Sequence, residues 1–158
     1  DVTAMCLRAL AKYRTRNDVS SACSGGVAFL SKAQDENGGF SSWSMKNSES
    51  VMQTIVALCA LDIPLDDPRF VKNGKTLATA LECYMLENGA FLHVLQGEEN
   101  LMATEQGIVC LNAMRTAESK MLVRELLIPL VRNPLSVKQI SRDCTRMMHV
   151  FFNLTKAR

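Results

Sequence analysis

The distribution of apolar residues along the chain predicts helices of two kinds. Residues 51–61 and 107–114 are apolar on nearly all sides, which is typical of a helix enclosed by its neighbours. Residues 22–34 and 74–86 keep charged side chains such as Lys32 on one side, so they suit a half-exposed helix. This alternation of enclosed and half-exposed helices predicts an all-α fold with two layers of helices.

One short block occurs twice, each time after a half-exposed helix and before an enclosed one. It reads ENGGF at residues 36–40 and ENGAF at residues 87–91, so the chain carries an internal repeat of about fifty residues. Gly38, Gly39 and Gly89 supply the positive φ that ends a helix tightly, and the phenylalanine of each block can then pack under the turn. A repeat of this length predicts a helical array.

A third enclosed helix begins at the first residue, and the three enclosed helices can be aligned with one another. In that alignment Asp1, Glu49 and Met102 take the same place. The candidate N-caps of the second and third helices are Asn47 or Ser48, and Thr104.

Several segments of the repeat resemble a known superfamily. Residues 33–43 (AQDENGGFSSW) and 47–50 (NSES), followed by an Ala- and Leu-rich helix, resemble the prenyltransferase and squalene-oxidase repeat of the terpenoid-cyclase toroids. Residues 67–74 (DPRFVKNG) and 102–106 (MATEQ) resemble the bacterial surface-protein branch more closely. The resemblance covers residues 1–117 and implies a partial α/α toroid of alternating inner and outer helices, amounting to about half a ring.

The C-terminal part of the chain departs from the repeat. We expect residues 1–117 to form the repeat domain and residues 118–158 to form a helical segment that caps the open edge of the array or engages a partner. Half a ring exposes apolar helix faces at its edges. A protein partner, or homodimerisation through these edges, would cover them.

The chemical marks of the catalytic branches are missing from the matching positions. Residues 48–51 (SESV) contain no thiolate where protein prenyltransferases hold zinc. Residues 62–68 (DIPLDDP) match the acidic motif of squalene-type cyclases only loosely, and their two prolines favour a loop between helices. Ala103 stands where the thioester branch has its thiol. We therefore expect no catalytic residue of these branches, no metal and no cofactor.

Five residues are candidates for lining a ligand cavity near the starts of the enclosed helices. They are Trp43, Glu49, Gln53, Glu105 and Gln106. Simpler roles stay open for them: the indole can join one helical hairpin to the next, and Glu105 can interact with the positive end of its helix dipole.

Composition narrows the choice of partner. The net charge is +2, aromatic residues make up only 6%, and the chain holds no apolar run long enough to cross a membrane, so neither nucleic acid nor a membrane span is expected. The six cysteines form no Cys-x-x-Cys motif, and His93 and His149 fall in no ligand spacing with them. We expect buried thiols rather than disulfides, and we expect His93 to lie in a solvated loop.

The resulting hypothesis is a non-catalytic binding module of a bacterial surface or exported protein, which holds a small apolar ligand or a protein. The cell-surface location follows from the resemblance, although reduced cysteines would also suit the cytoplasm. The alternative is a prenyltransferase-like or terpene-cyclase-like enzyme with a divergent site. Its acid candidates are Asp1, Glu49, Asp66 and Asp67, one of which would need a raised pKa in an apolar cavity. A relative of the vitamin-carrying toroids would require a second domain.

Overall fold

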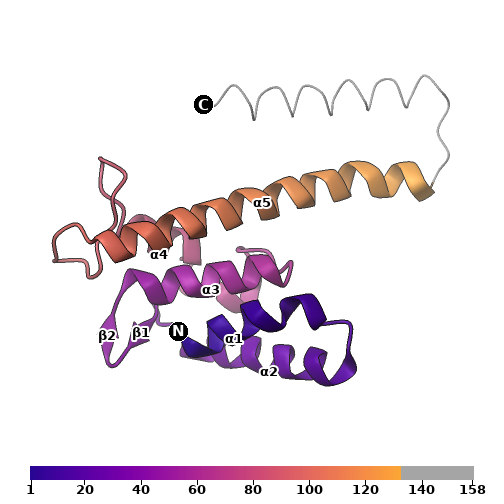
Figure 1. Cartoon of the computed structure of the whole chain (residues 1–158), viewed down its shortest axis with the longest axis horizontal. Helices are drawn as coiled ribbons and strands as arrows, with labels where there is room; N and C mark the ends of the chain where they lie inside the picture. The colour runs from indigo at the N-terminus through magenta and orange to yellow at the C-terminus, as the bar shows by residue number, and fades with distance from the viewer. Residues whose placement is uncertain (133–158) are drawn as a thin grey trace. The chain divides into compact units, whose positions relative to one another are not determined.

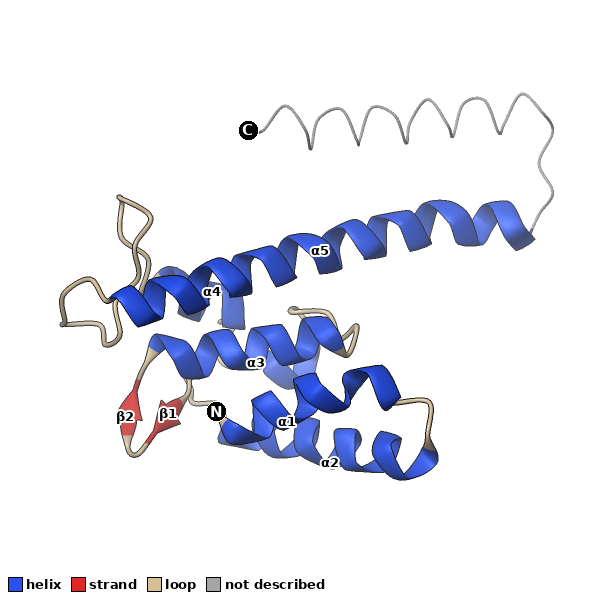
Figure 2. Cartoon of the chain, in the orientation of Figure 1, coloured by secondary structure: helices blue, strands red, loops and turns tan. Residues whose placement is uncertain are grey.

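A computed structural model describes residues 1–132, and this part of the chain is mostly helical, as the hydrophobic pattern predicts (Figures 1 and 2). The α-helices are α1 Val2–Leu10, α2 Asn17–Ala33, α3 Ser48–Ala60, α4 Leu77–Glu82 and α5 Leu101–Arg132. The remaining elements are the 3₁₀ helices η1 Ala11–Tyr13 and η2 Pro68–Phe70, and the antiparallel hairpin of β1 Ser41–Ser42 and β2 Met45–Lys46.

The chain divides into two compact units, Asp1–Ala117 and Glu118–Arg158. Helix α5 runs across the boundary, and the described residues of the second unit belong to it. The predictions that concern Cys144, His149 and the last helical segment lie outside the described residues. No helix within residues 1–132 is both long and apolar enough to span a membrane.

Helix α3 is the central helix of the first unit. It packs against α1 and α4, and from Ser48 to Cys59 only Gln53 escapes full burial. No charged residue follows Glu49 in this helix, which is why it can be enclosed on all sides. Helix α2, by contrast, buries one stripe and exposes the rest, so the two predicted kinds of helix are both present.

Helix α5 corrects the prediction that residues 107–114 are enclosed. Ala103, Gly107 and Cys110 recur at helical spacing and form one buried stripe, while Ile108 and Val109 are exposed. This stripe packs against the hydrophobic core of the first unit, together with the partly buried Ala113, Met114 and Ala117. The predicted helix over residues 74–86 is also shorter than expected, because the capping box at Thr76 sets its start and its last turn ends at Glu82.

The two repeated blocks form the tight turns that their glycines predict. Gly38 and Gly89 have φ values of +81° and +85°, whereas Gly39 does not have the positive φ expected of it. Phe40 and Phe91 are buried beside them. At Gly38 a side chain is excluded by space as well as by φ, since a Cβ there would lie 2.9 Å from the backbone oxygen of Thr76.

The helix caps agree with the sequence at α3 and differ at α5. Asn47 caps α3, because its Oδ1 accepts a hydrogen bond of 2.9 Å from the backbone N–H of Ser50. Asn100, and not Thr104, caps α5 by accepting from the N–H of Ala103 at 3.0 Å. The Thr104 hydroxyl instead accepts from the N–H of Phe91 at 2.9 Å, which ties the second block to α5.

The cysteines differ in their exposure. Cys23, Cys59 and Cys110 are buried, as predicted, whereas Cys6 and Cys83 are exposed because they lie on the outward sides of their segments. Burial, with a smaller contribution from the nearby Cys59, raises the pKa of Cys110 to about 12.

This difference predicts which thiols react in the native protein. The thiolate is the reactive form, so iodoacetamide at pH 8 should modify Cys6 and Cys83 at least about a hundredfold faster than Cys110. Peptide mass spectrometry over a time course measures the three rates, and guanidinium unfolding should make them equal. A Cys110 rate equal to that of Cys83 in the folded protein would contradict the burial of α5.

A second prediction concerns the contact between α5 and the second block. A Cβ at Gly107 would lie 2.5 Å from Cδ2 of Phe91, whose ring is 1% exposed and cannot move away. Gly107→Ala should therefore destabilise the protein by about 1–3 kcal/mol through overpacking.

Gly25→Ala is the matched control. Gly25 also lies within a helix, but a Cβ there meets no atom within 4 Å. Its replacement should stabilise the protein by up to about 1 kcal/mol through helix propensity. Urea unfolding of both variants measures the effects, and a neutral Gly107→Ala would show that α5 does not rest on Phe91.

Candidate functional site

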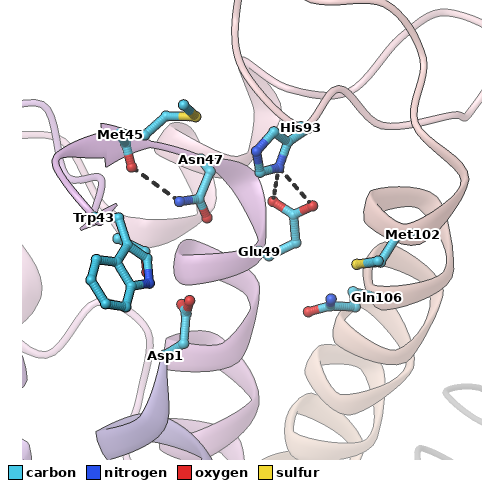
Figure 3. A pocket seen from close by; sticks show the side chains of 9 residues that line it. Asp1, Trp43, Met45, Asn47, Glu49, His93, Met102 and Gln106 are labelled. Atoms are coloured by element: carbon cyan, nitrogen blue, oxygen red, sulfur yellow. Dashed lines mark hydrogen bonds and ion pairs between the residues drawn. The ribbon is translucent and has the colours of Figure 1, made fainter.

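The three residues that the repeat aligns line one cavity. Asp1 precedes the first turn of α1, Glu49 lies in the first turn of α3, and Met102 lies in the first turn of α5. All three border a cavity of about 370 Å³, and Figure 3 shows them around it. Its full lining is Asp1, Ser42, Trp43, Met45, Asn47, Glu49, His93, Met102 and Gln106. The starts of α1, α3 and α5 therefore meet at one site in the first unit. The prediction that the first helix is enclosed is wrong, because α1 buries only Ala4 and Leu7 and exposes most of its remaining surface.

A carboxylate and an imidazole form the main polar contact of the cavity. Nδ1 of His93 lies 2.9 Å and 2.8 Å from the two carboxylate oxygens of Glu49. Because an ionised carboxylate only accepts, Nδ1 carries the hydrogen and Nε2 is left as the other reactive nitrogen of the ring. The Glu49 side chain is 11% exposed and that of His93 44% exposed. His93 lies in a loop and is partly exposed, as predicted, but its contact with Glu49 is not predicted from the sequence.

Ser48 holds the loop that carries His93. Its backbone N–H donates to the carbonyl of His93 at 3.0 Å, and its hydroxyl donates to the carbonyl of Leu92 at 2.6 Å. Both groups of Ser48 are buried, so these bonds satisfy polar atoms that water cannot reach. The first turn of α3 therefore carries Glu49 and also holds the loop of His93, with which Glu49 pairs.

The hairpin places Trp43 at the edge of the cavity. Trp43 and Ser44 are its two loop residues, with φ values of +52° and +64°. These angles are those of a type I′ turn, which normally carries Asn and Gly, so a tryptophan here is conformationally costly. The side chain of Trp43 is 99% exposed, which corrects the alternative that it joins two helical hairpins.

Two side chains secure the hairpin. Asn47, the cap of α3, donates from its Nδ2 to the carbonyl of Met45 at 3.0 Å. Asp35 accepts from the N–H groups of Asn37 and Gly39 at 2.8 Å and 3.0 Å and forms an ion pair of 2.8 Å with Lys46 on β2. Partial burial opposes the ionised form of Asp35, but Lys46 and the two N–H groups outweigh it and lower the pKa of Asp35.

The glutamines at equivalent positions of α3 and α5 meet directly. Nε2 of Gln53 donates to Oε1 of Gln106 at 2.9 Å. Gln106 lines the cavity, whereas Gln53 only contacts Gln106 and is not part of the lining. Glu105 is exposed and also does not line the cavity, because one step along a helix turns a side chain away from its neighbour.

The other acid candidates lie away from this site. Asp66 is exposed, and Asp67 caps η2 and bonds to Arg69. That hydrogen bond from Arg69 lowers the pKa of Asp67, which is the opposite of what a general acid requires.

Sequence reasoning missed several lining residues. Ser42 and Met45 carry no motif of their own. Met102 could be expected near a cavity, because it takes the same place as Asp1 and Glu49 in the repeat alignment. His93 could have been found from its position two residues after the second block, because that block is fixed to the start of α5. Within residues 1–132, no three His, Cys, Asp or Glu side chains gather as a metal site would require.

Comparison with known proteins gives no relative for this site. No protein-family model matches the chain, and neither a curated protein nor a solved structure matches it. The argument for function therefore rests on the residues and their geometry.

The hydrogen bonds of Asp35 predict a pH-dependent contribution to stability. The pKa of Asp35 is lower in the native state than in the unfolded state, so ionised Asp35 stabilises the native state. This stabilisation is present above the unfolded-state pKa of about 4 and is lost as the pH falls through the lower native-state pKa. Asp35→Asn should cost about 1–2 kcal/mol at pH 7 and much less at pH 3. Urea unfolding at both values measures the difference.

Glu36→Gln provides the control, since Glu36 is the adjacent, exposed acid of the same block. It should leave stability nearly unchanged at both pH values. An Asp35→Asn cost that persists undiminished at pH 3 would show that the carboxylate charge is not what holds the turn and the hairpin.

Proposed function

We propose that residues 1–117 form a non-catalytic binding module of a surface or exported protein, built as part of an α/α toroid, and that its ligand occupies the cavity at the starts of α1, α3 and α5. The observation that carries the proposal is that Asp1, Glu49 and Met102, equivalent in the repeat, border the same cavity. Its volume of about 370 Å³ lies in the usual range for small-molecule sites. The surface location rests on the sequence resemblance alone.

The direction of the helices supports the toroid. Helices α1, α3 and the first part of α5 run the same way, and α2 runs back against them (Figure 1). In a ring of alternating layers all inner helices share one direction, so their starts meet at one end. That end is where the cavity lies.

The lining of the cavity supports small-ligand binding over chemistry. Two thioethers and an indole contribute apolar wall beside six polar residues. Four of the polar residues are held by hydrogen bonds to neighbouring residues: Asn47, Glu49, His93 and Gln106. A concave, partly apolar site with a few placed polar groups is the general character of a ligand site.

A divergent isoprenoid enzyme is the second candidate, and the contact between Glu49 and His93 favours it. A carboxylate that orients an imidazole is a common arrangement for a general base. Among the described residues that line the cavity, however, His93 is the only basic side chain. A diphosphate leaving group needs more positive charge than one imidazole supplies, so the binding module is the better-supported function.

Methyl groups of methionine provide a direct test. In protein labelled with ¹³C at the methionine methyls, a ligand in the cavity should shift the signals of Met45 and Met102 together and saturably, because both side chains border it. Met45→Leu and Met102→Leu assign the two signals. A screen should include neutral, cationic and anionic small molecules and an isoprenoid diphosphate.

The methyl signal of Met52, which lies buried in α3, is the internal control and should stay in place. If no compound of any charge class moves Met45 and Met102 at millimolar concentration, the cavity is not a binding site. Turnover of the isoprenoid diphosphate, lost in Glu49→Gln, would replace the proposal with the enzyme.

A further inference from the structure

The charge of the cavity determines which ligands it attracts. Its lining side chains include two carboxylates, Asp1 and Glu49, and one imidazole, that of His93. Glu49 is almost completely covered, so its charge acts through little intervening water. An anionic ligand would meet repulsion here, and a cation would meet attraction.

The wall of the cavity offers contacts that suit methyl groups. Trp43 presents a fully exposed indole at the tip of the hairpin, and the thioethers of Met45 and Met102 lie in the same lining (Figure 3). A cation over the face of an indole is attracted by the negative charge of the ring face. An exposed tryptophan held at positive φ is costly in both solvation and conformation, so its placement points to a role outside folding.

Three of the side-chain acceptors that line the cavity already hold a hydrogen bond from the protein, whereas the Asp1 carboxylate makes no capping hydrogen bond to α1. Both oxygens of Glu49 accept from His93, Oδ1 of Asn47 accepts from the N–H of Ser50, and Oε1 of Gln106 accepts from Gln53. A primary ammonium or a guanidinium must replace the hydrogen bonds that it loses from water. A methylated ammonium has few or no N–H groups and carries no such requirement.

We infer that the cavity binds a small methylated ammonium compound, with its charged head over the indole of Trp43 and beside the carboxylates of Asp1 and Glu49. This inference rests on the proposed function and adds the chemical class of its ligand. The carboxylates supply the charge complement, and the indole and the thioethers offer contacts to the methyl groups. A cation with few N–H groups suits a lining in which Glu49, Asn47 and Gln106 already hold hydrogen bonds.

The probe is choline, with 3,3-dimethylbutan-1-ol as its neutral isostere of nearly the same shape. Trp43 is the only tryptophan of the chain, so its fluorescence reports on the site directly. Choline should change the emission saturably and bind at least about tenfold more tightly than the alcohol, which is the size of effect expected for loss of a cation–π contact and a nearby charge. Equal affinities would overturn the inference, because shape alone would then explain binding.

Variants identify the groups responsible, with affinity read by calorimetry because the first variant removes the fluorophore. Trp43→Ala should weaken choline binding about tenfold or more and leave the fold intact, since the side chain is exposed. Glu49→Gln should also weaken choline binding while binding of the neutral alcohol is unchanged. Tyr13→Ala is the control: Tyr13 is also an exposed aromatic residue, but it is not part of the cavity lining, and choline should bind this variant as it binds the parent.

Failure of this inference is distinct from failure of the binding module. If neutral or anionic compounds shift the Met45 and Met102 methyl signals and choline does not, the cavity is a binding site of another class. If methylamine binds as tightly as tetramethylammonium, the acceptors of the cavity remain available and the preference for methylation is wrong. Unchanged choline affinity in Trp43→Ala would place the cation elsewhere.

Discussion

The first turn of α3 is the part of the structure on which the site depends. Asn47, Ser48 and Glu49 are polar residues at the start of an enclosed helix, and all three are buried. Buried polar groups must find partners, because water cannot supply them. Asn47 donates a hydrogen bond to Met45 of the hairpin, and Ser48 donates one to Leu92 in the loop that follows the second block. Glu49 contacts the imidazole of His93 in that loop. The polar groups of this one helical turn need hydrogen-bond partners, and their bonds bring together three segments that are far apart in the sequence.

The repeat explains why these segments can meet at one end of the first unit. Each block makes a tight glycine turn after one helix and leads to the start of the next, which is α3 after the first block and α5 after the second. The starts of α1, α3 and α5 border one cavity, so equivalent positions of the repeat come together there. The three copies nevertheless differ in chemistry, with an acid at Asp1 and at Glu49 and a thioether at Met102. The geometry is repeated, whereas the chemistry is specific to each copy.

Two costly features of the structure lie beside the cavity. The turn of the hairpin carries Trp43 and Ser44 where Asn and Gly are normally found, and the indole is left in water. The core gains nothing from either feature. The contact of Phe91 with Gly107, by contrast, improves packing. Because Gly107 has no side chain, α5 can approach the ring of Phe91 closely.

Local periodicity and the conformational freedom of glycine are enough to predict the helical class, the two glycine turns and the enclosed nature of α3. The sequence also named Trp43, Glu49 and Gln106 as candidates for one cavity, and all three line it. The single buried stripe of α5 and its cap Asn100 became apparent only in the folded structure. Tertiary structure alone also placed His93 against Glu49, because that contact joins residues 44 positions apart and depends on the two buried hydrogen bonds of Ser48. Local patterns specify the elements, but a site formed between elements depends on which buried polar groups find one another.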